Sequence, residues 1–359
     1  MTDAAVERRA RAIPRPRPRA LTVTALGGAA VFLAGALLVG TAIGPVHVGV
    51  GAIAESALSH IPFLGLHSHL SSTQDAIVWQ LRFPRVVLGA LVGGMLALGG
   101  ASYQGVFRNP LADPYLLGVA AGAGLGATLA VAYLPHGFAA HDALPPAAFA
   151  GAIVAVAIAY AIGRAASPRS SGAALVLAGV TVASFFTAVQ TFVQQQHADT
   201  LQEVYSWILG SLPSSGWTDV VLVLPYVGVA AAGLLVHRRL LDVLSLGDEE
   251  AASLGVNVRR VRLTIVVLAT IGTAAAVAVS GLIGFVGIIV PHALRLLFGS
   301  SYRILLPLSL LGGAGFLVLA DVVARTALSP AEIPIGVVTA FCGAPFFAVV
   351  LRTSRRMIG

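Results

Sequence analysis

The sequence contains no lysine, a single cysteine and few charged residues of either sign. Without lysine the chain cannot form a P-loop, whose lysine holds the nucleotide phosphates, so any ATP that drives its activity must be hydrolysed by another polypeptide. Cys342 can form no disulfide within the chain, and its place in an apolar run predicts a small buried side chain. Because it lacks lysine, the chain itself is not expected to bind or hydrolyse ATP through a P-loop.

Apolar residues take the place of the missing charge. Hydrophobic residues make up 57% of the 359 residues and charged residues only 10%, and the mean hydropathy is +0.89. This is more apolar surface than one soluble core can bury, so lipid must cover much of it. We therefore expect an all-α polytopic membrane protein, because the apolar runs are too long for barrel strands.

Ten apolar runs are long enough to cross a bilayer, which takes about 20 residues as a helix. The predicted spans are 21–44, 84–106, 114–134, 145–163, 173–195, 217–237, 261–280, 281–298, 304–324 and 335–351. They form one permease domain over 21–359, preceded by a disordered basic tail over 1–20.

The arginines predict the orientation of these spans. With the N-terminus in the cytoplasm, 19 of the 22 arginines fall on the cytoplasmic side, and only Arg82, Arg85 and Arg325 fall outside. This asymmetry follows the positive-inside rule and places both termini in the cytoplasm. The same rule accounts for the six arginines of the tail, so nucleic-acid binding is a weaker interpretation of them and no nucleic-acid partner is expected.

Acidic residues are nearly absent from the predicted spans. Of the 15 Asp and Glu residues, 14 lie in tails, in loops or at the ends of spans, and the exception is Asp321, four residues before Arg325. An ion pair on one helix face is the favoured interpretation, with a proton relay as the alternative. The chain therefore lacks the midplane carboxylates that an ion-coupled carrier usually needs.

The longest cytoplasmic connection, 241–262, has the composition of a short independent helix. Asp248, Glu249 and Glu250 suit the positive end of a helix dipole, and Gly255 can close the helix in a left-handed conformation. Ala251, Ala252 and Leu254 would form an apolar face. From composition alone, a docking element for a cytoplasmic partner and an ordinary solvated helix are equally acceptable.

Six ordered motifs resemble the FecCD-type permeases of type II ABC importers, which carry ferric siderophores, haem or cobalamin. They extend from about residue 75 to the C-terminus and read LRFPR (81–85), FRNPLADPYLLGVAAGAGLG (107–126), YSWILGSL (205–212), LGDEEAASLGV (246–256), GLIGFVGIIVPHALRLLFG (281–299) and EIPIGVVTAFCGAPFF (332–347). The resemblance implies a ten-helix subunit of the bacterial plasma (inner) membrane. It also implies a second copy, two ATPase subunits that bind ATP and Mg, and an extracytoplasmic substrate-binding protein, with no cofactor on this chain.

The resemblance assigns roles to three groups of residues. The segment 247–255 matches the coupling helix that contacts the ATPase, which favours the docking interpretation above. The turn RNPLADP matches the cytoplasmic gate, with candidates Asn109, Leu111, Ser170, Ser171 and Gly172. Leu111 could close the path by excluding water, although a plain loop residue would look the same.

Arg82, Arg85 and Arg325 match positions that meet acidic residues of the binding protein. Charge-assisted pairs of this kind can orient a docked partner. The alternative is that Arg82 and Arg85 only anchor their helix at the lipid headgroups.

The cargo is less well specified. The resemblance implies that the second, third, fifth, eighth and tenth spans form the translocation path. Gln190 and Gln194, on the fifth span, could contact the cargo or could be interfacial polar residues. His67 and His69 form an H-x-H pair that could bind metal, although the solvated interpretation is favoured. Ferric siderophore is the default cargo, followed by cobalamin and haem. A secondary carrier and a scaffold without transport remain the competing functions.

Overall fold

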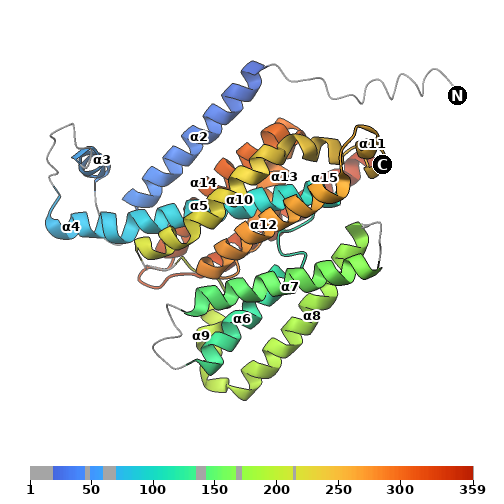
Figure 1. The fold of residues 1–359 in the computed structure, drawn as a ribbon. Coiled ribbons are helices and arrows are strands. Elements are labelled where there is room, and N and C mark those ends of the chain that lie inside the picture. Colours follow the sequence, from blue (N-terminus) through green and yellow to red (C-terminus); the bar gives the residue numbers. More distant parts are fainter. Residues whose placement is uncertain are drawn as a thin grey trace.

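A computed structural model of the chain describes residues 19–44, 49–59, 70–134, 143–166, 172–212 and 216–358. Helices account for most of these residues (Figure 1). The ten principal helices are α2 (Arg19–Ala42), α5 (Phe83–Phe107), α6 (Val119–Tyr133), α7 (Leu144–Ala166), α8 (Gly172–Gln196), α10 (Trp217–Leu244), α12 (Val258–Ser280), α13 (Val286–Phe298), α14 (Tyr302–Thr326) and α15 (Ile335–Ile358). Each corresponds to one predicted span, so the all-α prediction is confirmed. The predicted disordered tail lies almost entirely outside the described residues.

Within the described residues, seven helices are long and apolar enough to cross a membrane, and three further apolar segments, Val119–Tyr133, Val286–Phe298 and Ile335–Val350, are shorter. The predictions of helix over 114–118 and 281–285 are wrong, because both segments are irregular. Gly118 and Phe285, which immediately precede α6 and α13, both have positive φ, at 90° and 69°. The 13 residues of α13 span only about 20 Å, so the irregular segment must complete this crossing.

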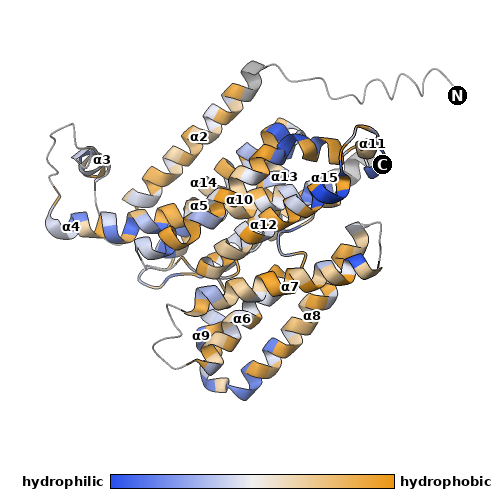
Figure 2. Cartoon of the chain, viewed as in Figure 1, coloured by the Kyte–Doolittle hydropathy of each residue, from blue (hydrophilic) through white to orange (hydrophobic). Residues whose placement is uncertain are grey.

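The helices form two groups that meet along α12 (Figure 1). In one group α14 packs against α5 and α2, and in the other α6 packs against α7 and α8. Glycines allow the closest approaches: Gly93 faces the backbone of Gly313, and Gly122 faces that of Gly151. Figure 2 shows apolar colouring along α2, α7, α8 and α10, as expected of surfaces that face lipid.

Short elements cover the two ends of the bundle. At one end lie α3 (Val50–Ser59), α4 (Ser72–Ala76), the π-helical turn η1 (Ile77–Arg82) and α9 (Leu201–Ile208). The sequence did not predict α3, α4 or α9 as helices. The opposite end of the bundle holds α11 (Asp248–Ser253), which contacts α10 and α12, and α15 also ends there (Figure 1). Because α2 ends beside Arg82 and Arg325, its first residue lies toward the α11 end. The first and last described residues, Arg19 and Ile358, therefore lie toward the same end of the bundle.

Candidate functional site

Helix α11 is held between two glycines with positive φ. Gly247 (φ 133°) precedes the helix and Gly255 (φ 82°) follows it. The amide of Gly255 donates to the carbonyl of Ala252, and that of Val256 donates to the carbonyl of Ala251. These bonds satisfy the last carbonyls of the helix, as a left-handed glycine cap does. The short helix predicted from the acid-rich segment is therefore present.

Asp248 ties α11 to two neighbouring helices. Its carboxylate accepts bonds of 2.9 and 3.1 Å from Nη2 of Arg262, on α12. It also lies 3.3 Å from Nη2 of Arg108, the residue that ends α5. The side chain of Arg262 is only 6% exposed, whereas that of Arg108 is 45% exposed. Asp248 therefore holds the helix in place rather than presenting a free charge.

The rest of α11 divides into a buried side and an open side. Glu249, Glu250, Ala252 and Leu254 are exposed, and Leu254 shows 62% of its surface. Ala251 is fully buried against the subunit itself, so the expectation that it belongs to the outward apolar face is wrong. Its small side chain instead seats the helix on the bundle. The open side combines two acids with one large apolar side chain.

The turn after α5 is stiff and closely attached to α13. The Oδ1 of Asn109 accepts a 3.0 Å bond from the amide of Leu111, and the amide of Ala112 donates to the Asn109 carbonyl at 3.0 Å. A Cβ on Gly287 would lie 2.6 Å from Cδ of Pro114. Leu111 is 54% exposed. This stiff turn therefore presents one apolar side chain at the α11 end of the molecule.

The partner turn of the predicted gate is only partly described. A Cβ on Gly172 would lie 3.5 Å from the ring of Phe107, the last residue of α5. The start of α8 is thus close to the RNPLADP turn, as the gate prediction requires. Ser170 and Ser171 lie outside the described residues, as do His67 and His69. Among the described residues, no group of three or more His, Cys, Asp or Glu could hold a metal ion.

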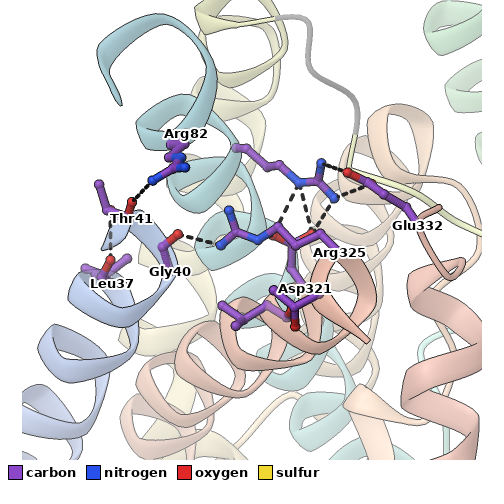
Figure 3. A network of polar contacts seen from close by, with 10 residues as sticks. Leu37, Gly40, Thr41, Arg82, Asp321, Arg325 and Glu332 are labelled. Atoms are coloured by element: carbon purple, nitrogen blue, oxygen red, sulfur yellow. Dashed lines mark hydrogen bonds and ion pairs between the residues drawn. The ribbon is translucent and has the colours of Figure 1, made fainter. Parts of the chain in front are cut away.

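At the opposite end, the three outer arginines form one cluster with two acids (Figure 3). Arg85 donates from Nε and Nη2 to Asp321, at 2.8 to 3.2 Å. It also donates from Nη1 and Nη2 to Glu332, at 3.0 and 2.8 Å. The Nε of Arg325 lies 3.3 Å from the second oxygen of Asp321. The predicted i,i+4 pair on α14 is therefore confirmed, and Asp321 is shared with Arg85.

The same cluster fixes the end of α2. Arg82 donates to the carbonyls of Thr41 and Ala42 at 3.3 and 3.1 Å, and Arg325 donates to the carbonyl of Gly40. Arg82 and Arg325 are each only 5% exposed. Both side chains thus serve packing within the subunit, and a docking role for them stays a prediction. Arg85 is the most accessible of the three arginines: 14% of its side chain is exposed, and its partner Glu332 is 52% exposed.

Glu332 lies in the link between α14 and α15, and Arg85 shifts the pKa of its carboxyl group. Its pKa is lowered from its ordinary value, chiefly by the hydrogen bond from Arg85, against an opposing effect of burial. The carboxylate is therefore ionised throughout the neutral range.

Gln190 and Cys342 have different surroundings from those expected, while the assignment of Gln194 stays a prediction. Gln190 is buried and its amide lies against Gly124 on α6, so it packs inside the subunit. Gln194 is half-buried. Cys342 is exposed on α15, and the expectation of a buried thiol is wrong for the single subunit. Its neighbour Phe341 lines an apolar hollow of about 590 Å³ together with Ile208, Leu209, Leu282, Gly336 and Pro345, among others, whereas Cys342 is not part of that lining.

Sequence reasoning did not identify Arg108, Arg262 or Glu332 as partners at these sites. Arg108 and Glu332 lie inside quoted motifs and Arg262 ends the 241–262 connection, but no spacing rule relates residue 108 to 248 or 85 to 332. Only the fold brings these charges together.

Comparisons with known proteins agree with this architecture. Residues 32–353 match the FecCD transport family. The chain is 40% identical to the cobalamin import system permease protein BtuC of Halobacterium salinarum, over 93% of this chain and 96% of that protein. It is 40% identical to the hemin transport system permease protein HmuU of Yersinia pestis, over 80% and 88% of the two chains.

A solved structure of a metal-chelate type ABC transporter, in an inward-facing conformation, has the same fold. It superposes with a TM-score of 0.79 at 31% identity, over 91% of this chain and 98% of the other. The apolar helices and these relatives indicate a multi-pass protein of the bacterial inner membrane, which transports rather than catalyses. The match over residues 32–353 shows that this chain belongs to the FecCD transport family.

Proposed function

We propose that the chain is the membrane permease subunit of an ATP-driven importer that moves a bulky metal chelate into the cytoplasm. The observation that carries this proposal is α11, a short acidic helix fixed to the bundle by Asp248 and Ala251 while Glu249, Ala252 and Leu254 stay uncovered. A helix clamped on one side and open on the other suits docking to a soluble subunit. Since the chain has no lysine, that subunit would supply the P-loop and bind ATP and Mg.

The proposed cargo is a ferric siderophore, cobalamin or haem. Relatives named for cobalamin, hemin and iron(3+)-hydroxamate import support this class. The apolar hollow beside α15 supports it as well, since its lining carries no charged side chain. A surface of this kind would let a large chelate pass without binding it tightly. The siderophore is our first choice within the class.

The complete importer would contain a second copy of the chain, two ATPase subunits and an extracytoplasmic binding protein. The hollow beside α15 is open on one side, and a second copy facing it would complete a central path. The outer cluster would receive the binding protein, with Arg85 as the most accessible cation. In the free subunit Arg85 is paired with Glu332, so a carboxylate of the binding protein would have to replace that of Glu332.

Purification with the neighbouring subunits tests the proposal against a carrier that works alone. We expect a stable complex with an ATPase, and uptake of ferric siderophore into proteoliposomes that requires ATP and the binding protein. Uptake that continues without nucleotide but stops when the proton gradient is dissipated would refute the importer. The ion pairs that enclose Asp321 already disfavour such a carrier, because a relay carboxylate must exchange protons.

A further inference from the structure

Asp248 is held by two arginines that differ in burial. Arg262 has an almost covered side chain, and its Nη2 donates to both oxygens of Asp248, at 2.9 and 3.1 Å. Arg108 makes a single 3.3 Å contact with Asp248, and both side chains of this pair are partly exposed. A covered ion pair is costly to break, whereas an exposed one contributes little and exchanges readily with water. The link from α11 to α12 is therefore the permanent one, and the link to Arg108 can form and break.

Arg108 is also the first residue of the stiff turn described above. It ends α5 in a left-handed conformation, at φ 51°. Asn109 and Leu111 follow directly and are joined by the bond from the Leu111 amide to Asn109 Oδ1. Pro110 lies between them and has a fixed φ. Arg108 and Leu111 are three residues apart, and the segment between them has little conformational freedom. A displacement of the Arg108 side chain is therefore passed on to Leu111.

Gly247 keeps this contact close. A Cβ at this position would clash with the Glu250 carboxylate and would lie 3.6 Å from Nη1 of Arg108. The φ of 133° at Gly247 is one that side chains rarely adopt. Glycine at this position therefore suits the backbone conformation and leaves room for the Glu250 carboxylate, within contact distance of the Arg108 guanidinium.

We infer that Arg108 is a positioning residue that transmits movement of α11 to the gate turn, through its exchangeable pair with Asp248. The inference rests on the proposed function, in which the ATPase moves α11. When α11 shifts with α12 through Arg262, the Arg108 pair breaks or reforms. The turn that carries Leu111 is then released or held.

The test follows two spin labels in the complex of the full chain with its ATPase, in lipid nanodiscs. Cys342→Ala provides the background, and Leu111→Cys or Ser253→Cys, both exposed positions, carries the label. Label mobility is compared with and without a non-hydrolysable ATP analogue and Mg. In the parent we expect both positions to respond. With Arg108→Gln we expect position 253 to respond as before and position 111 to lose at least two thirds of its response.

Two further variants isolate the contact. Arg303→Gln breaks an exposed pair with Asp242 on the same end of the molecule and should leave both responses intact. Arg108→Lys keeps the charge and should restore part of the response at position 111. An unchanged response at 111 in Arg108→Gln overturns the inference while the importer stands. Loss of the ATPase in that variant also overturns it, because Arg108 would then belong to the docking surface. A parent chain that recruits no ATPase refutes the proposed function itself.

Discussion

The buried carboxylate of Asp321 is stabilised by ion pairs with two arginines. Asp321 is 2% exposed and lies between the guanidinium groups of Arg85 and Arg325. The spacing of 321 and 325 predicts half of this arrangement, because i,i+4 neighbours share a helix face. Arg85 lies 236 residues away in sequence, and only the close contact of α5 with α14 brings it near. Local pairs can thus be predicted from spacing, and long-range pairs cannot.

Asp321→Asn should strongly destabilise the subunit. The change keeps the shape but leaves the buried Arg325 without its counter-charge, and breaking a buried pair typically costs about 3–5 kcal/mol. We expect a clearly lower unfolding temperature for the purified protein in detergent. Asp199→Asn changes an exposed acid at the same end and is the matched control. Equal unfolding temperatures for the two variants would contradict a stabilising role for Asp321.

Glu332→Gln should have a small effect that depends on pH. Arg85 lowers the pKa of Glu332 below its ordinary value of 4.5, so its stabilising contribution is fully present above about pH 4.5 and is lost as the pH falls through the lower, folded-state pKa. Because the side chain is half exposed, we expect about 0–1 kcal/mol at neutral pH. Unfolding temperatures of parent and variant, measured between pH 3 and 7, should converge only at the acid end. If the difference in unfolding temperature grew toward low pH, the pKa of Glu332 would not be lowered in the folded protein, and the prediction would be wrong.

Helices and turns were predicted with uneven success. The ten apolar segments correspond to ten helices because hydrophobic length determines what can cross a bilayer. The starts of α6 and α13 were predicted too early, since 114–118 and 281–285 are as apolar as a helix. Their course depends on tertiary contacts such as the pair of bonds between Tyr115 and the backbone of Ile283. For α11, the acidic first turn and the glycine cap were sufficient, but which side is open was not predictable.

The open side of α11 should determine ATPase binding. Reversing the charge of an exposed acid while leaving Asp248 intact should weaken the docking surface without releasing the helix. We therefore expect Glu249→Arg to reduce the yield of co-purified ATPase at least fivefold, with an unchanged unfolding temperature of the permease. Glu203→Arg makes the same reversal on α9 at the opposite end and should recover the complex in full. Equal losses in both variants would attribute the effect to net charge rather than to α11.

At the scale of the whole molecule, charge distinguishes the two ends and apolar surface identifies the sides. The arginine count predicts which end is cytoplasmic, and the structure gathers α11, the gate turn and the end of α15 at one end (Figure 1). What lies beside the lateral surface cannot be inferred from composition, because lipid and a second copy both suit apolar side chains. Phe341, 75% exposed on α15 next to the hollow of about 590 Å³, is a surface of this ambiguous kind.

The single cysteine of the chain offers a direct test of the second copy. If two subunits face each other across their α15 helices, the two exposed Cys342 thiols lie near one interface, within reach of a bis-maleimide reagent with a long spacer. We expect a covalent dimer from the parent protein in proteoliposomes, with a yield that does not fall as the lipid-to-protein ratio is raised. Diluting the protein would separate random neighbours but not a stable pair.

The control moves the thiol to a surface that should face lipid. Gly27 lies on α2 in open space, with no atom near a Cβ placed there. Cys342→Ala combined with Gly27→Cys should therefore give dimers only at high protein density, and Cys342→Ala alone should give none. Dimers that form equally from positions 27 and 342, and that disappear from both on dilution, would mean that α15 faces lipid. The open hollow would then be a groove for acyl chains rather than one wall of a path.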